Sequence, residues 1–270
     1  MLLILALPVV YAGLCAALYL FQDKLIFLRQ PLATDAIKFI QRLHPDAEEL
    51  RIRSEDSLTL HGWFKRGAAR SKAPLLIYFG GNAEEVSWML DDFTRRAAIA
   101  VALVNYRGYG LSEGLPSESA LFADSLAIYD ALVARADVDA SRVAVMGRSL
   151  GTGVATYLAA QRPLRAVVLV SPYDSLVQVA QSHYPLFPVS WLMRYRFDSL
   201  SRAPQIAVPM LALAGSRDTL VTPLRSRALA QSWKGTHRVE LLDGVGHNDI
   251  TGHAQFWPTV DAFLEHSLAP

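Results

Sequence analysis

The sequence predicts an α/β protein whose mostly parallel sheet carries helices on both faces, preceded by a transmembrane helix. From residue 74 onward, short apolar runs alternate with segments of helical periodicity, which is the pattern of consecutive βαβ units. Residues 1–21 contain no charged side chain and have the length of a helix that crosses a bilayer. The chain of 270 residues is also long enough to bury the core of one large domain.

Composition excludes two classes of function. The 26 basic side chains nearly balance the 25 acidic ones and form no run of Lys or Arg, so no nucleic-acid partner is expected. The single cysteine, Cys15, lies in the apolar N-terminal stretch. A chain with one cysteine forms neither an internal disulfide framework nor a cysteine-based zinc site.

Residues 1–22 are interpreted as a retained single-pass membrane anchor. No Lys or Arg precedes the apolar run and no small-x-small cleavage site lies before Lys24, which argues against a removed signal peptide. A removed signal and a buried helix are the alternatives. Because Lys24 and Arg29 follow the span, the positive-inside rule favours a cytoplasmic position for the rest of the chain.

Residues 33–270 are expected to form one domain that begins with a β-hairpin. Leu50–Ser54 and Leu58–Arg66 alternate as strands do, with an Asp-Ser turn between them. Further strands are expected at 74–80, 99–106, 142–147, 164–170, 208–215 and 237–244, and helices at 84–97, 117–136, 149–161, 222–233 and 254–266. The segment at about 175–209 interrupts this alternation and is expected to form a cap over the site.

Ser149 is the candidate nucleophile. Ligands of such sheets bind beyond the carboxyl ends of the strands, and Ser149 follows a strand and begins a helix within a G-x-S-x-G pattern at Gly147–Gly151. A sharp turn there raises the serine hydroxyl above the sheet and leaves no space for bulky neighbours, which explains the glycines. The helix start also supplies backbone N–H groups. A structural or phosphate-binding turn is the alternative, but no Gly-Lys-Ser/Thr follows.

A serine nucleophile needs a histidine base that a carboxylate orients, and both are expected after the serine, with the acid first. Asp218 follows the strand expected at 208–215, and His247 follows the strand expected at 237–244. The two residues therefore complete a Ser-His-Asp triad in the expected order.

Rival residues exist for both partners. Asp174 lies one strand too early for the commonest arrangement, and Asp243 suits a turn. His253 is close to His247 in sequence but falls within the predicted last helix. Asp218 and His247 are therefore preferred.

The oxyanion hole is expected to use two backbone N–H groups. One belongs to Leu150, directly after the nucleophile, and the other to the loop after the first parallel strand. That loop reads Phe-Gly-Gly-Asn-Ala at 79–83, and its glycines permit close approach of the backbone to a reacting carbonyl. Asn82 is therefore the expected second donor. An ordinary glycine turn with Asn82 as a helix cap is the alternative.

With these residues in place, the chain resembles the α/β-hydrolase superfamily from Leu50 to Pro270. More narrowly, it is similar to the membrane-anchored α/β-hydrolase-domain serine hydrolases, which include protein depalmitoylases and uncharacterised bacterial members. Six blocks in order carry this resemblance. They are YFGGNAEEV (78–86), NYRGYGLSEGLPSE (105–118), GRSLGTG (147–153), SPYDSL (171–176), GSRDTLVTP (215–223) and GVGHNDI (244–250).

The resemblance implies an α/β-hydrolase fold with the same triad and the same two oxyanion donors. The segment Tyr106–Gly110 is expected to be scaffold. One departure is visible, because members of the family commonly carry His-Gly where this chain has Gly80 and Gly81. The support of that histidine side chain is therefore expected to be missing.

The sequence thus favours a membrane serine hydrolase that cleaves carboxylic esters or thioesters through an acyl-enzyme, with no metal and no cofactor. The expected substrate is a small, lipid or acylated molecule, and the candidates for contact with it are Gly81, Tyr173 and His183. The aromatic insertion is expected to be mainly a short cap on the core, and lining an acyl pocket or resting on the bilayer is the alternative. A serine aminopeptidase of the same fold and a catalytically silent binding protein are the rival functions.

Overall fold

The computed structural model describes residues 2–68, 72–93, 96 and 98–270, and within them eight strands form a single sheet of order β1-β2-β4-β3-β5-β6-β7-β8. β2 pairs antiparallel with β1 and β4, and every other neighbouring pair is parallel. The strands are β1 (Ala47–Arg53), β2 (Thr59–Lys65), β3 (Ala73–Phe79), β4 (Ala100–Val104), β5 (Val138–Arg148), β6 (Ala166–Val170), β7 (Met210–Gly215) and β8 (His237–Leu242). The expected mostly parallel sheet is confirmed.

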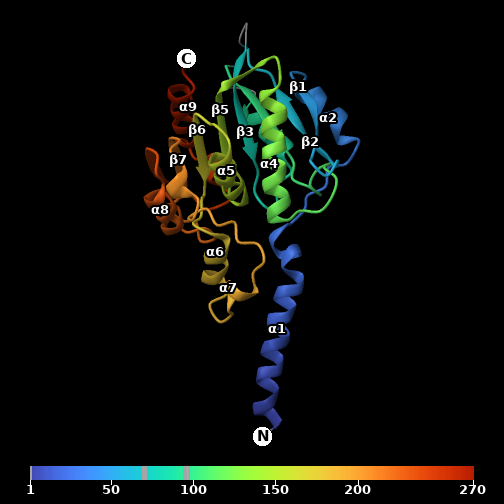
Figure 1. Cartoon of the computed structure of the whole chain (residues 1–270), viewed down its shortest axis with the longest axis vertical. Helices are drawn as coiled ribbons and strands as arrows, with labels where there is room; N and C mark the ends of the chain where they lie inside the picture. The colour runs from blue at the N-terminus through green and yellow to red at the C-terminus, as the bar shows by residue number, and fades with distance from the viewer. Residues whose placement is uncertain (1, 69–71, 94–95, 97) are drawn as a thin grey trace.

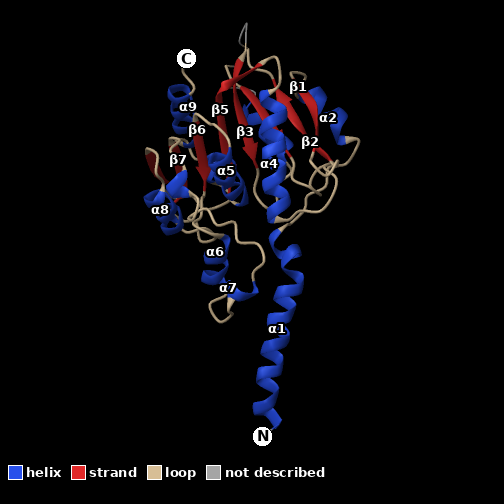
Figure 2. Ribbon diagram, viewed as in Figure 1, coloured by secondary structure: helices blue, strands red, loops and turns tan. Residues whose placement is uncertain are grey.

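Helices cover both faces of the sheet (Figure 2). Along β3, Leu75 and Ile77 face a core shared with α4, α5 and α8, whereas Leu76 and Tyr78 face a core shared with α2, α3 and α9. This alternation follows from the two-residue period of a strand. The α-helices are α1 (Leu2–Ile26), α2 (Ala36–Leu43), α3 (Leu90–Phe93), α4 (Glu118–Val133), α5 (Leu150–Gln161), α6 (Leu176–His183), α7 (Val189–Leu192), α8 (Pro223–Ser232) and α9 (Phe256–Ser267). The 3-10 turns are η1 (Val86–Met89), η2 (Ala203–Gln205) and η3 (Ile250–Gly252).

Two helical predictions differ from the structure. The helix expected at 84–97 is reduced to η1 and α3, and residues 94, 95 and 97 of that prediction lie outside the described residues. It begins late because Asn105 accepts the backbone N–H of Val86 and Glu85 accepts that of Ser87, which holds the preceding loop out of helical geometry. The second difference is α2, which the sequence reading did not predict. It packs on the outer part of the sheet through the buried Ile40.

The apolar helix α1 projects from the domain, and the segment that contains α6 and α7 lies beside it (Figure 1). The part of α1 from Leu7 to Ile26 has a mean hydropathy of 1.4, and only 6% of it is buried. By length and composition α1 is therefore a candidate for a transmembrane span. It extends beyond residue 22, where the anchor was expected to end. The insertion between β6 and β7 holds α6, α7 and η2.

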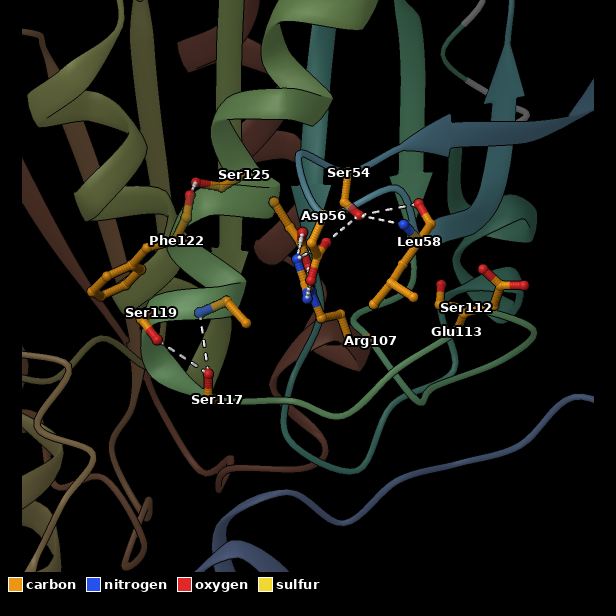
Figure 3. Close-up of polar contacts among 12 residues, drawn as sticks. Ser54, Asp56, Leu58, Arg107, Ser112, Glu113, Ser117, Ser119, Phe122 and Ser125 are labelled. Carbon is orange, nitrogen blue, oxygen red and sulfur yellow. Dashed lines mark hydrogen bonds and ion pairs between the residues drawn. The ribbon is translucent and has the colours of Figure 1, made fainter.

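Arg107 joins three segments near the antiparallel edge of the sheet (Figure 3). Its guanidinium donates to both carboxylate oxygens of Asp124 in α4, at 2.6 Å each, and to Asp56 in the turn between β1 and β2, at 2.5 and 3.0 Å. Ser54 donates its hydroxyl to Asp56 and accepts the backbone N–H of Leu58, which closes that turn. Arg107 therefore holds the segment after β4 in place, consistent with its expected role as scaffold.

Arg107→Met is expected to lower the free energy of unfolding by about 3 to 5 kcal/mol, because it leaves the buried carboxylate of Asp124 without its charge partner. Arg162→Met is the matched control, since Arg162 pairs with Asp130 at the surface and such pairs contribute at most about 1 kcal/mol. Urea unfolding of the full chain in detergent measures both. Equal losses in the two variants would contradict the scaffold role of Arg107.

Candidate active site

The turn between β5 and α5 holds Ser149 in a conformation that non-glycine residues seldom adopt. Its φ is +49° and its ψ is −116°. A Cβ at position 147 would lie 2.3 Å from the carbonyl oxygen of Gly151, and a Cβ at position 151 would lie 2.1 Å from that of Phe79. Both flanking positions therefore require glycine. The turn sits against the end of β3 and raises the Ser149 hydroxyl at the carboxyl edge of the sheet.

The loops after β7 and β8 bring Asp218 and His247 to the same edge. Ser149 Oγ lies 2.9 Å from His247 Nε2, and His247 Nδ1 lies 2.7 Å from Asp218 Oδ2. With the serine hydroxyl donating to Nε2 and the Nδ1–H group donating to the carboxylate, both contacts are hydrogen bonds of normal length. The three residues predicted as a triad from widely separated positions thus lie in one connected row.

The carboxylate of Asp218 is buried and fully engaged. Its Oδ1 accepts the backbone N–H groups of Leu220 and Val221 at 3.0 and 2.8 Å. Burial alone raises the pKa of Asp218, but the hydrogen bond and the charge of His247, together with the Val221 N–H group, outweigh burial and hold the pKa below its ordinary value. Asp218 is therefore an ionised acceptor that fixes the orientation of the imidazole.

The rival residues have other partners. Asp174 accepts a hydrogen bond from Arg225 at 2.9 Å, and Asp243 accepts one from the hydroxyl of Ser216 at 2.9 Å. His253 lies between η3 and α9 rather than within the last helix as predicted, because η3 ends there and α9 begins only at Phe256. Neither of these two hydrogen bonds involves Ser149 or His247.

The two expected oxyanion donors line the same cavity as Ser149. Asn82 follows β3, and Leu150 is the first residue of α5. Two tyrosine hydroxyls hold the backbone of Asn82 and Leu150 in place through their carbonyl groups. Tyr109 donates its hydroxyl to the carbonyl of Asn82 at 2.6 Å, and Tyr173 donates to that of Leu150 at 3.2 Å.

Glu84 and Arg148 form a buried ion pair that the sequence reading did not find. Glu84 accepts the hydroxyl of Tyr78 at 2.6 Å, the backbone N–H of Gly81 at 2.7 Å and the guanidinium of Arg148 at 3.1 Å. Arg148 also donates to the carbonyl oxygen of His247 at 3.4 Å. The pair therefore connects the oxyanion loop with the loop that carries the histidine. The sequence feature that could have indicated this pair is a charged residue after each of two expected strands, Glu84 after 74–80 and Arg148 after 142–147.

The Glu84–Arg148 pair also bears on the loop in which this chain has Gly80 and Gly81 where family members commonly carry His-Gly. From the sequence, the loop at 79–83 is expected to lack the support of a histidine side chain. In the structure the carboxylate of Glu84 holds the N–H of Gly81, and the hydroxyl of Tyr106 donates to the carbonyl of Gly80 at 2.8 Å. The loop is therefore supported by Glu84 from its own sequence block and by Tyr106 from the block that follows β4.

A cavity of about 570 Å³ lies above Ser149, and most of its lining is apolar. Tyr173 and His183, two of the predicted substrate contacts, line it, and the His183 ring lies 2.9 Å from the carbonyl oxygen of Leu220. Gly81, the third, is not among the lining residues, although a Cβ at this position would lie 3.8 Å from Ser149 Cβ. Further lining residues come from α1, α6 and α7.

A sequence profile described as alpha/beta hydrolase fold matches residues 60–202, more than half of the chain. The chain belongs to the α/β hydrolase family. Family membership agrees with the sheet order, the turn at Ser149 and the position of the cavity at the carboxyl ends of the strands.

Relatives of the α/β hydrolase include proteins from bacteria, plants and animals. An uncharacterised protein of Mycobacterium tuberculosis strain H37Rv is 36% identical over 76% of this chain and 74% of that protein. The alpha/beta hydrolase domain-containing protein WAV2 of Arabidopsis thaliana is 29% identical over 95% and 91% of the two chains. The human alpha/beta hydrolase domain-containing protein 17C is 32% identical over 74% and 60%.

Solved structures share the fold of this hydrolase at low sequence identity. An esterase of Pyrococcus furiosus matches 83% of this chain and 91% of its own, with a TM-score of 0.67 and 18% identity. Acetyl xylan esterase 1 from a Thermoanaerobacterium species matches 89% and 96%, with a TM-score of 0.64 and 18% identity. These structures agree with the strand and helix arrangement described above.

Ser149→Gly is expected to unfold with a free energy about 1 kcal/mol higher than Ser149→Ala, because glycine adopts the positive φ of this turn without strain. Position 125, in the middle of α4, serves as the control: there the alanine variant is expected to be the more stable of the two, because glycine weakens a helix interior. Urea unfolding of the four variants measures the two differences. An alanine variant at 149 as stable as the glycine variant would contradict the strained turn.

Proposed function

We propose that this chain is a membrane-anchored serine hydrolase that cleaves carboxylic esters or thioesters. The observation that carries this proposal is the row of hydrogen bonds from Ser149 through His247 to Asp218 at the base of an apolar cavity. A hydroxyl, an imidazole and a carboxylate in this order form the arrangement that activates serine for attack on an acyl carbonyl.

The proposed reaction has two halves. In the first, His247 Nε2 takes the proton of Ser149 as Oγ attacks the acyl carbonyl, and the imidazolium then protonates the leaving alcohol or thiol. In the second, His247 takes a proton from water as the water attacks the acyl-enzyme, and the imidazolium then returns the proton to Ser149 Oγ as the bond between Oγ and the acyl carbon breaks, which releases the carboxylic acid and free Ser149. The ionised Asp218 stabilises the imidazolium in both halves.

The backbone N–H groups of Asn82 and Leu150 are proposed to bind the oxyanion that forms in each half. The position of Leu150 at the start of α5 adds the positive end of a helix dipole to its N–H group. The Glu84–Arg148 pair is proposed to set the distance between the oxyanion loop and the histidine loop, since it bonds to both.

The lining of the cavity favours an acyl group over a peptide with a free amino terminus. It is formed mainly by Leu, Val, Ile, Phe and Tyr side chains, and among the described residues that line it there is no Asp or Glu to bind an α-amino group. An aminopeptidase function therefore has less support than ester or thioester cleavage. Binding without catalysis has less support still, because the three side chains are aligned for proton transfer.

The anchor is proposed to be retained in the mature protein. Gln22 of α1 is buried against the segment after α7, where it accepts the backbone N–H of Arg194 at 2.7 Å and donates to the carbonyl of Leu192 at 3.1 Å. Removal of α1 would leave these backbone groups without their partner. With Lys24 and Arg29 at the end of the span, the positive-inside rule favours a cytoplasmic hydrolase domain.

Ser149→Ala is expected to lower kcat for a p-nitrophenyl acyl ester at least about 1,000-fold, because it removes the nucleophile. Asp218→Asn is expected to cost about 10,000-fold by stabilising the wrong imidazole tautomer, whereas Asp243→Asn is expected to retain full activity. A fluorophosphonate probe, read by peptide mass, is expected to modify Ser149 in the natural chain. Full activity of Ser149→Ala, or an unlabelled Ser149, would disprove the proposal.

Glu84→Gln is expected to lower kcat about 10- to 100-fold with little change in KM, because the oxyanion loop and the histidine loop lose their common charge partner. Glu113→Gln is the control, because Glu113 accepts the backbone N–H of Thr59 at the exposed start of β2 and does not line the cavity. Steady-state kinetics in detergent, with the thermal midpoint measured in parallel, give the result. A loss that follows the thermal midpoint instead of kcat would assign Glu84 a purely structural role.

A further inference from the structure

We propose that α1 is a substrate-binding element as well as an anchor: its last turns form one wall of the acyl cavity, so that the fatty acyl chain of a lipid ester reaches Ser149 directly from the bilayer. This inference rests on the proposed function, and it adds the substrate class and the route by which the substrate arrives. The juxtaposition of a membrane-length helix and the nucleophile in one cavity is the observation that carries it.

One stripe of α1 faces the cavity. Leu18, Gln22, Leu25 and Ile26 line it, and their spacing of four, three and one residues places them on one side of the helix. Most of the remaining lining belongs to α6, α7 and the segments that flank them, and the same cavity contains Ser149 with both proposed oxyanion donors. An acyl chain bound at Ser149 can therefore extend between α1 and the cap.

The contact between α1 and the cap is built from polar groups as well as apolar ones. Gln22 is 5% exposed, and its amide bonds to the backbone of residues 192 and 194. Beside it, Arg194 forms an ion pair with Asp23 at 2.7 Å. An amide in an apolar helix is costly to leave without partners in a membrane, so these bonds keep the lining stripe of α1 turned toward the cap.

The cap reaches well along the proposed span. The hydroxyl of Tyr11 donates to the carbonyl of Leu186 at 2.7 Å, and the ring of Tyr11 stacks on that of Phe187 with 5.6 Å between the ring centroids. Tyr11 lies 15 residues before Ile26, or about 22 Å along a helix. When α1 spans a bilayer, the tip of the cap therefore lies beside the hydrocarbon region, as the segment around α7 lies beside α1 in Figure 1.

The surface of the cap suits that position. Leu186 and Trp191 are 82% and 87% exposed, and neither side chain is covered by the domain. Exposed side chains of this size at the tip of the cap continue the apolar surface of α1. Asp23, Lys24 and Arg194 lie at the other end of the contact, where lipid headgroups would be, and the guanidinium of Arg196 donates to the carbonyl of Ser190 in α7.

The route of the substrate from the bilayer to Ser149 follows from the insolubility of a long acyl chain in water. Each methylene that leaves a bilayer for water shifts the partition equilibrium by about fourfold against the move, so withdrawal of a long chain through water is strongly disfavoured. A cavity that continues from the bilayer to Ser149 avoids this step. The occupant to which the structure points is a long-chain carboxylic ester that already lies in the membrane.

Leu18→Trp and Leu20→Trp form a matched pair that tests the wall. Residue 18 lines the cavity, whereas residue 20 lies about 200° further around the same helix and is 65% exposed. The full chain is placed in phospholipid vesicles and assayed with 4-methylumbelliferyl acetate and 4-methylumbelliferyl palmitate. Leu18→Trp is expected to lower the ratio of kcat/KM for the palmitate to kcat/KM for the acetate at least about tenfold, and Leu20→Trp is expected to leave this ratio unchanged. Equal behaviour of the two variants on both esters would overturn the inference.

The route is tested by dilution of the vesicles with buffer at a fixed mole fraction of palmitate ester. The initial rate per enzyme is expected to stay constant if the ester arrives through the bilayer, and a rate that falls with bulk concentration would overturn the inference. If Leu18→Trp fails to fold, a long-chain alkyl fluorophosphonate with a terminal diazirine replaces it. After reaction at Ser149, cross-linking to residues 18–26 supports the wall, and cross-linking only elsewhere overturns it.

Failure of the proposed function gives a different result. In that case the natural chain and Ser149→Ala would hydrolyse the acetate and the palmitate equally. If only the inference fails, the natural chain remains active on the acetate, Ser149→Ala is inactive, and the Leu18 and Leu20 variants do not differ. The two failures are therefore distinguished within one set of assays.

Discussion

The sharp turn between β5 and α5 is the constraint on which the rest of the structure depends. It holds Ser149 at a positive φ and requires glycine at 147 and 151, because the backbone of α5 and the end of β3 occupy the space that a side chain would need. This close approach sets the loop after β3, which is the proposed oxyanion loop, beside Ser149, the proposed nucleophile. Since β3, β5, β7 and β8 run in parallel, Asn82, Ser149, Asp218 and His247 all follow strand ends at one edge of the sheet.

Buried ion pairs fix the segments around this edge. Glu84 and Arg148 join the oxyanion loop to the histidine loop, and Arg107 joins the turn after β1 to α4 at the far side of the sheet. Because desolvation offsets much of the attraction within a buried pair, such pairs seldom raise stability over apolar packing. Their consequence here is positional, since each pair fixes the distance between segments that are far apart in the sequence.

The sequence was informative where the pattern is local. The run expected at 74–80 corresponds to β3 at Ala73–Phe79, and the serine, acid and histidine were chosen because each follows such a strand. Of the helix expected at 84–97, the described residues form η1 and α3, which begin only at Val86, where Asn105, 19 residues further along the chain, accepts the N–H group of Val86. No pattern within one segment reports such a contact.

The same limit applies to the site. The Glu84–Arg148 pair was not predicted because its members lie 64 residues apart and each has an ordinary local role, one in a loop and one before the serine. The wall that α1 contributes to the cavity was missed for a similar reason. Residues 1–22 have the composition of any anchor, and only Gln22 and the contact of Tyr11 with the cap reveal that the helix is docked.

One cavity is proposed to join an activated Ser149 to the membrane helix α1. The structure of the full chain in a lipid nanodisc after reaction with a long-chain alkyl fluorophosphonate tests it most directly. The account predicts phosphorus bonded to Ser149 Oγ, a phosphoryl oxygen within hydrogen-bond distance of the N–H groups of Asn82 and Leu150, and an alkyl chain between α1 and the cap. An adduct whose oxygen faces away from both N–H groups, or whose chain leaves the cavity toward water, would contradict it.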